Sequence, residues 1–132
     1  MIRNTAVTVC GPLNVNKLGV TYVHEHLMVK PQLPDEYYIP YTLDDEAAST
    51  EETRSFSAAG GETLVEMTPI NYGRNVKAYQ RIAQATGVHV ICCTGFHKQL
   101  FMPPWFGDKT DGELYDILMD EVTNGLDDTE IH

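Results

Sequence analysis

Strand-like and helix-like stretches alternate along this 132-residue chain, and that order constrains its fold more than any single motif. Strands that alternate with helices favour right-handed βαβ units and a parallel sheet. The strand-like stretches, rich in β-branched residues, lie at residues 6–10, 18–27, 63–67 and 88–94. The helix-like stretches lie at residues 44–59, 75–86 and 110–124. The sequence therefore predicts an α/β fold that a short strand or hairpin arm precedes.

The last strand-like stretch, residues 88–94, indicates whether the sheet is covered on one face or on both. Val88–Thr94 is nearly all apolar, which is typical of a strand whose two faces are both covered. Three parallel strands fit either an open α/β sheet or part of a closed (β/α)₈ barrel, and periodicity alone does not separate these. Pro31–Pro40 contains three prolines and predicts an irregular loop.

The charge balance and the cysteines limit the partners and the compartment that we expect. The chain has 9 basic and 19 acidic residues, a net charge of −10, so nucleic acid and anionic membranes are not expected partners. It has no run of about 18 apolar residues that would predict a transmembrane span. Three cysteines, of which Cys92 and Cys93 are adjacent, make no disulfide framework, so we expect a reducing cytoplasm.

His24 and His26 have the most chemical content. Residues i and i+2 of a strand face the same side, so the two imidazoles are expected side by side, with Cα atoms about 6–7 Å apart. Both could then bind one metal ion, at the carboxyl end of a strand, where α/β proteins place their sites. Glu25 would face the helices instead. His24 and His26 supply only part of a catalytic zinc site, which needs three protein ligands. The alternative to a metal site is a pair of polar residues at a strand end.

Three further side chains are candidates for contacts with a substrate. His97 follows the strand at 88–94 on its carboxyl side, and Lys98 is next to it. Arg74, with Gly73, precedes a helix, so its guanidinium and the backbone amides could together receive an anion. The alternative for His97 is an ordinary loop histidine. The alternative for Gly73 and Arg74 is a simple entry into the helix.

Short segments spread over nearly the whole chain carry a family resemblance. They are Thr8–Pro12, Leu18–Thr21, His24–Leu27, Ala59–Pro69, Gly73–Asn75, Arg81–Gly87, Cys93–Phe96 and Asp120–Thr129. In this order they resemble the phosphotriesterase family of the amidohydrolase superfamily. The resemblance is much more specific than the histidine pair alone.

The resemblance implies a distorted TIM barrel with two divalent metal ions, usually zinc, in which His24 and His26 match the strand-1 ligands of the more buried ion. The metals would lower the pKa of a shared water and polarise the oxygen under attack. Family members hydrolyse lactones, sugar lactones or organophosphate triesters, which implies a small-molecule ester or lactone substrate, and they are often homodimers. Where the family often has tyrosine this chain has His97, and Lys98 beside it favours an anionic or phosphorylated substrate.

The length determines how much of such a barrel the chain supplies. A (β/α)₈ barrel takes about 250 residues, whereas residues 1–132 supply about three βα units, an incomplete N-terminal part. The remaining metal ligands and the general base, an aspartate of strand 8, are expected beyond residue 132. Two function classes stay open. One is a metal-dependent hydrolase of ester bonds, as part of a longer chain. The other is a truncated non-catalytic fragment or a self-associating α/β module.

Overall fold

The computed structural model describes residues 4–31 and 42–132, so nearly all of the loop predicted at Pro31–Pro40 lies outside the described residues. The chain begins with an antiparallel hairpin of β1 (Thr5–Thr8) and β2 (Gly11–Asn14). The predicted short strand or hairpin arm is thus confirmed. Gly11, expected to end the first strand, instead begins the second, where its φ of +108° lets the chain reverse direction.

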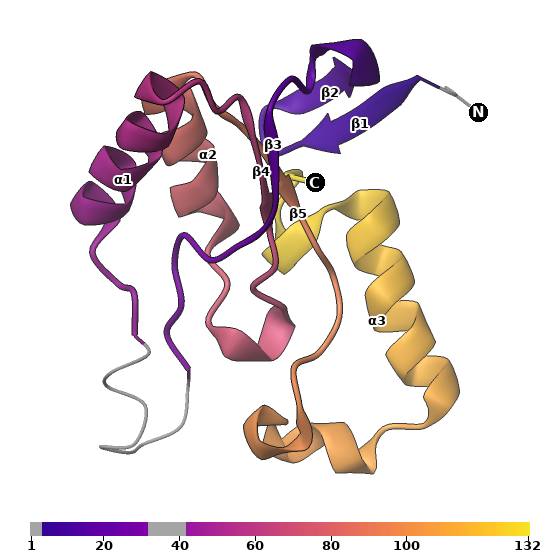
Figure 1. Ribbon diagram of the computed structural model, residues 1–132. Helices are drawn as coiled ribbons and strands as arrows, with labels where there is room; N and C mark the ends of the chain where they lie inside the picture. Colours follow the sequence, from indigo (N-terminus) through magenta and orange to yellow (C-terminus); the bar gives the residue numbers. More distant parts are fainter. Residues whose placement is uncertain (1–3, 32–41) are drawn as a thin grey trace.

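A parallel three-stranded sheet follows the hairpin along the chain, and the candidate site lies on this sheet. Its strands are β3 (Thr21–Glu25), β4 (Thr63–Glu66) and β5 (His89–Cys92), arranged in the order β3-β4-β5. Both pairings are parallel, as the alternation of strands and helices predicts. In Figure 1 the hairpin lies at one end of this sheet, and the loops that follow the three strands lie at the other.

Helices α1 (Glu46–Ala58) and α2 (Val76–Thr86) lie together on one side of the sheet (Figure 1). Each begins where a side chain accepts a hydrogen bond from a backbone amide of the first turn, Asp45 in α1 and Asn75 in α2. The periodicity of α2 predicts that one face is apolar, and the members of that face are all buried: Val76, Tyr79, Ile82 and Ala83.

Helix α3 (Asp111–Asn124) differs from the other two. The capping box between Thr110 and Glu113 that its sequence predicts is present. Its predicted apolar face is only partly buried, however, since Leu114, Ile117 and Leu118 are half-buried and Val122 is 59% exposed. The physical reason is that α3 lies on the far side of β5 from α1 and α2 (Figure 1), and the described element that it contacts most is the short segment Leu126–Asp128.

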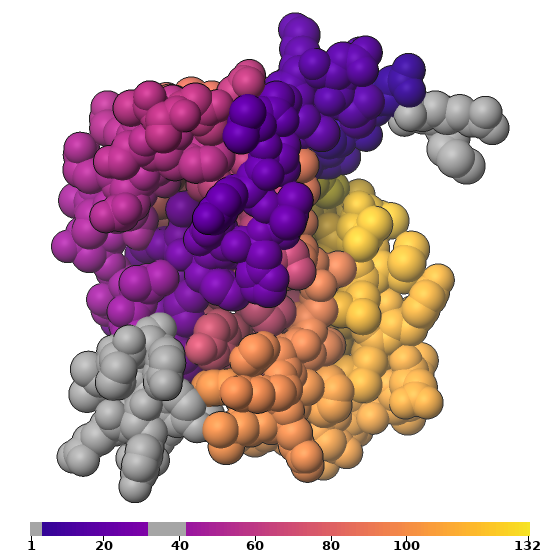
Figure 2. All heavy atoms as spheres, in the orientation of Figure 1, coloured from indigo at the N-terminus to yellow at the C-terminus, as the bar shows by residue number. Residues whose placement is uncertain are grey.

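Strand β3 lies at an open edge of the sheet and contains an irregularity. Tyr22 pairs with Leu64 but Glu25 pairs with Glu66, so β3 holds one residue more than β4 over this stretch. Tyr22 and Glu25 consequently both line a groove of about 570 Å³ between β3 and α1. In Figure 2 the atoms of β3 reach the surface, and Val23 is 73% exposed. Within the described residues, no helix has the length and apolarity to cross a bilayer.

Candidate metal and substrate site

The two histidines at the carboxyl end of β3 lie next to each other. Their ring centroids are 5.3 Å apart in an edge-to-face arrangement. Their spacing explains why, because residues two apart in an extended chain face the same side. The groove against α1 is lined by Tyr22 and Glu25, as expected for Glu25, and His26 lines it as well.

The ring of His26 is supported from the neighbouring strand. Its Nδ1 lies 2.9 Å from the hydroxyl oxygen of Thr68, just past the end of β4. The same Nδ1 lies 3.8 Å from Oε1 of Glu66, whose side chain is fully buried. Glu66 accepts hydrogen bonds from two backbone amides, those of Leu27 and Thr68. One buried carboxylate therefore ties the ends of β3 and β4 together beneath the histidine.

The surroundings favour neutral histidine and oppose a charge on the buried carboxyl. Burial lowers the pKa of His26, and the neighbouring His24 and His97 lower it further. Neutral imidazole is the form that binds a metal. Burial raises the pKa of Glu66, against the effect of the hydrogen bonds that its carboxylate accepts from Thr68 and Leu27.

An aromatic cluster connects the histidine pair to the loop after β5. Tyr72 lies between them, with ring centroids 6.3 Å from His26 and 4.6 Å from His97. The backbone amide of His97 donates to Oδ1 of buried Asn71 at 2.6 Å. Burial and the charge of Lys98 lower the pKa of His97, and the ammonium of Lys98 lies 5.4 Å from the Phe101 ring. The structure thus brings His24, His26, His97 and Lys98 to one end of the sheet.

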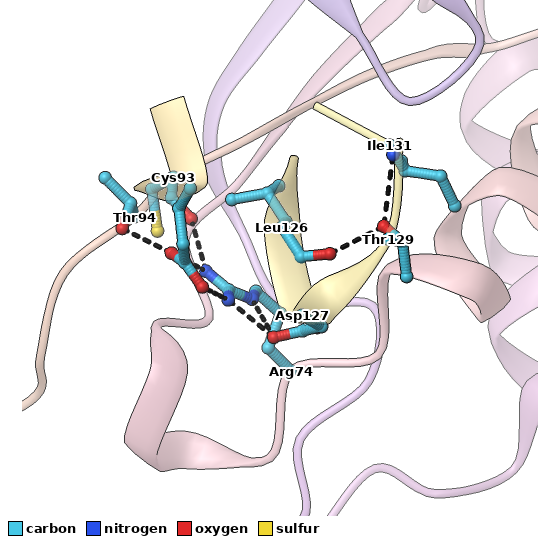
Figure 3. A network of polar contacts seen from close by, with 8 residues as sticks. Arg74, Cys93, Thr94, Leu126, Asp127, Thr129 and Ile131 are labelled. Atoms are coloured by element: carbon cyan, nitrogen blue, oxygen red, sulfur yellow. Dashed lines mark hydrogen bonds and ion pairs between the residues drawn. The ribbon is translucent and has the colours of Figure 1, made fainter. Parts of the chain in front are cut away.

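Arg74 is placed differently from these four residues. Its side chain is 1% exposed, and its five N–H donors match the five hydrogen bonds that it makes. They go to the carboxylates of Glu121 and Asp127 and to the carbonyl of Cys93 (Figure 3). Burial alone would lower the pKa of Arg74, but the hydrogen bonds that it donates to Asp127 and Glu121 hold it above its ordinary value. With every donor engaged within the chain, the substrate contact predicted for Arg74 gains no support from this arrangement.

The donor set fits part of a metal centre. Nδ1 of His26 is engaged by Thr68, which leaves its Nε2 available to a metal, and the neighbouring ring of His24 adds a second imidazole. Among residues 4–31 and 42–132, no cluster of three or more histidine, cysteine or acidic side chains is arranged to hold a metal. The described chain therefore offers two imidazole ligands, fewer than the three of a catalytic zinc site.

Sequence reasoning missed the residues that support the pair. Glu66, Thr68 and Tyr72 lie on β4 or after it, some forty residues beyond the histidines. The available signal was a carboxylate at the end of an apolar strand, because a buried charge needs partners. Their convergence on His26 depends on the pairing of β3 with β4.

Comparisons with known proteins agree with this fold. The phosphotriesterase family profile matches residues 4–132. A phospho-furanose lactonase from Mycoplasmopsis synoviae is 34% identical over 134 residues, covering 97% of this chain and 38% of that protein. The crystal structure of a lactonase from Listeria monocytogenes superposes with a TM-score of 0.85 at 27% identity, covering 96% of this chain and 44% of the other. An organophosphorus hydrolase from Deinococcus radiodurans gives a TM-score of 0.82 at 29% identity, covering 98% and 41%.

These matches identify the fold first and the family second. The three βα units, with the hairpin before them, are the N-terminal portion of a (β/α)₈ barrel. The chain belongs to the phosphotriesterase family. It spans between 36% and 47% of the length of eight curated relatives that it matches.

Proposed function

We propose that this chain supplies the first two ligands, His24 and His26, of a binuclear metal centre in a hydrolase of small-molecule esters. The observation that carries the proposal is the adjacent pair of imidazoles at the carboxyl end of β3, with His26 held by Thr68. Family membership supports it, because the matched relatives include a lactonase and an organophosphorus hydrolase. When bound, two divalent ions, zinc in the first instance, would activate water and polarise the ester oxygen.

The chain's other residues at this end would contact the substrate. His97 and Lys98 follow β5, and the exposed ammonium of Lys98 could pair with an anionic group. A phosphorylated lactone has such a group, and the relative from Mycoplasmopsis synoviae is named a phospho-furanose lactonase. Tyr72 lies between His26 and His97 and separates the metal side of the site from the substrate side.

Metal titration by calorimetry tests the ligand pair. Zinc should bind the unmodified chain, and His24→Ala or His26→Ala should weaken binding by more than the roughly 10–100-fold that loss of an outer-shell partner costs. His89→Ala is the matched control, because His89 begins β5 and lies at the opposite end of the sheet. Equal zinc affinity in all three variants would refute the assignment.

A second candidate is a non-catalytic fragment or a self-associating α/β module. It is favoured by the exposed face of α3 and the open edge of β3, which leave apolar residues without cover. Native mass spectrometry distinguishes the two. The hydrolase predicts that these residues occur within a longer polypeptide, whereas a single species at 14.8 kDa, or a multiple of it, supports the module.

The three cysteines of the chain are free, which supports a reducing compartment such as the cytoplasm.

A further inference from the structure

Two loops meet at the carboxyl end of the sheet, and three hydrogen bonds join them. One loop follows β4 and contains Ile70 and Asn71, and the other follows β5 and runs from Gly95 to Phe101. The backbone amide of Ile70 donates to the carbonyl of Gly95 at 3.0 Å. The other two bonds both go through the side chain of Asn71.

The side-chain amide of Asn71 bonds both ends of the turn at residues 97–101. Its Oδ1 accepts from the backbone amide of His97 at 2.6 Å, and its Nδ2 donates to the backbone carbonyl of Phe101 at 2.9 Å. Between these contacts the chain makes one 3₁₀ turn, in which the amide of Phe101 donates to the carbonyl of Lys98. Asn71 is only 8% exposed, so water offers little in place of these bonds. One side chain of the neighbouring loop therefore fixes both ends of the turn.

Asparagine suits this position because its amide carries a donor and an acceptor on one planar group. An ionised aspartate has two acceptor oxygens, so it could accept from His97 but would place its second oxygen against the carbonyl of Phe101. Leucine has nearly the same shape as asparagine and offers neither group. Substitution at this one position thus removes either one contact or both.

The turn holds the two side chains that are predicted to contact the substrate. The ring of His97 lies against two aromatic rings, with centroid distances of 4.6 Å to Tyr72 and 5.0 Å to Phe101. The Phe101 ring is buried, and its centroid lies 4.8 Å from that of Tyr72 and 5.4 Å from the ammonium of Lys98. Fixing the backbone at His97 and Phe101 therefore places both the imidazole and the ammonium.

We propose that Asn71 is a positioning residue, which holds the turn at residues 97–101 so that His97 and the exposed ammonium of Lys98 face the substrate beside the histidine pair. This inference rests on the proposed function for the identity of the ligand, an anionic group such as a phosphate. The arrangement of the turn is a property of the chain alone. Because the turn is already formed, an anion that binds Lys98 does not have to order it, and less of the binding free energy is lost.

Nuclear magnetic resonance of the full chain tests the arrangement without metal or substrate. In the unmodified chain, a scalar coupling across the hydrogen bond should connect the amide nitrogen of His97 with the side-chain carbonyl carbon of Asn71. Asn71→Leu should remove this coupling, accelerate hydrogen exchange at His97 and change the ring-current shifts that Phe101 causes in the Lys98 side chain. Asn71→Asp keeps the acceptor for His97, so exchange there should stay slow while the Lys98 shifts change.

Asn75→Ala is the matched control for these variants. Asn75 lies four residues further along, and its Oδ1 accepts from the backbone amide of Ala78 as the cap of α2. Its loss should lower the stability to urea but leave the His97 exchange and the Lys98 shifts unchanged. Urea unfolding of all three variants separates a general loosening from a specific effect on the turn.

Titration with inorganic phosphate relates the turn to the substrate. Phosphate should shift the Lys98 side-chain resonances of the unmodified chain, and Asn71→Leu should weaken this binding by roughly 2–10-fold, since the anion must then order a side chain as well. Unchanged exchange at His97 and unchanged Lys98 shifts in Asn71→Leu would overturn the inference, and so would an equal phosphate affinity in the two chains. If the turn responds as expected but phosphate leaves the Lys98 resonances of the unmodified chain unmoved, the positioning by Asn71 stands and the anionic substrate of the proposed function fails.

Discussion

Helices α2 and α3 both have a capped N-terminus and an apolar face in sequence, a more sharply segregated one in α2, yet they differ in how far that face is buried. Helix α2 buries Tyr79 and Ile82 completely, whereas α3 has no fully buried residue. The difference lies in their neighbours, since α2 lies beside α1 and against β5. Helix α3 has no such neighbour among the described residues. The comparison teaches that an apolar stripe is buried only where a second element supplies the opposing surface.

A single buried arginine ties the two regions together. Arg74, just before α2, binds Glu121 of α3 and Asp127 in the segment after it (Figure 3). Together with the hydrogen bond that the Thr94 hydroxyl donates to Glu121, this network links α3 to the end of β5. Four kinds of variant test this difference between α2 and α3. They remove the guanidinium of Arg74, a buried side chain of α2, the N-terminal cap of α3 and a surface ion pair, in that order of expected effect.

Arg74→Met should have the largest effect. Removing the guanidinium leaves Glu121, which is 11% exposed, and Asp127 without their partner, and breaking a buried ion pair in this way costs about 3–5 kcal/mol. Urea unfolding at neutral pH measures the loss. Arg81→Met is the matched control, because Arg81 also pairs with a carboxylate but is 56% exposed, so its loss should change stability little. Equal losses in the two variants would show that burial of the pair does not matter.

Ile82→Ala should have the next largest effect. Ile82 is fully buried in α2, so its truncation should lower the free energy of unfolding by about 2–5 kcal/mol. Ile117→Ala makes the same change in α3, where the side chain is only half-buried, and should cost about 1–2 kcal/mol. Thermal unfolding of the two variants measures both. A cost for Ile117→Ala as large as that for Ile82→Ala would mean that α3 is packed in solution.

Thr110→Ala should destabilise α3 alone. The variant removes the hydroxyl that accepts from the amide of Glu113, and the loss of such a cap costs about 0.5–2 kcal/mol. Hydrogen exchange of the α3 amides should accelerate while that of the α2 amides stays unchanged, because α3 is weakly coupled to the core. Thr123→Ala, near the other end of α3, serves as the control. Faster exchange in α2 would contradict the separation of the two helices.

The smallest effect is expected for the ion pair that joins α1 to α2. The hydrogen bond and charge of Arg81 hold the pKa of Glu46 below its ordinary value. A carboxyl with a lowered folded-state pKa stabilises the protein above its unfolded-state pKa, and this stabilisation is lost as the pH falls through the folded-state value. Melting temperatures of the unmodified chain and Glu46→Gln should thus converge between about pH 6 and pH 3. A difference that widens in acid would reverse the sign.

The sequence by itself determined the features that depend on near neighbours. The order of strands and helices, the buried face of α2 and the capping box at Thr110 follow from periodicity and hydrogen bonds within about four residues. The adjacency of His24 and His26 also follows from a strand period of two.

Only the tertiary structure decided the features that depend on distant partners. Thr68 is 42 residues from His26 in the chain, and Glu121 is 47 from Arg74, so no local pattern predicts either contact. The extra residue of β3 has meaning only against β4, because register is a property of two strands. Likewise, whether the apolar face of α3 is buried depends on what packs against it and not on the stripe itself.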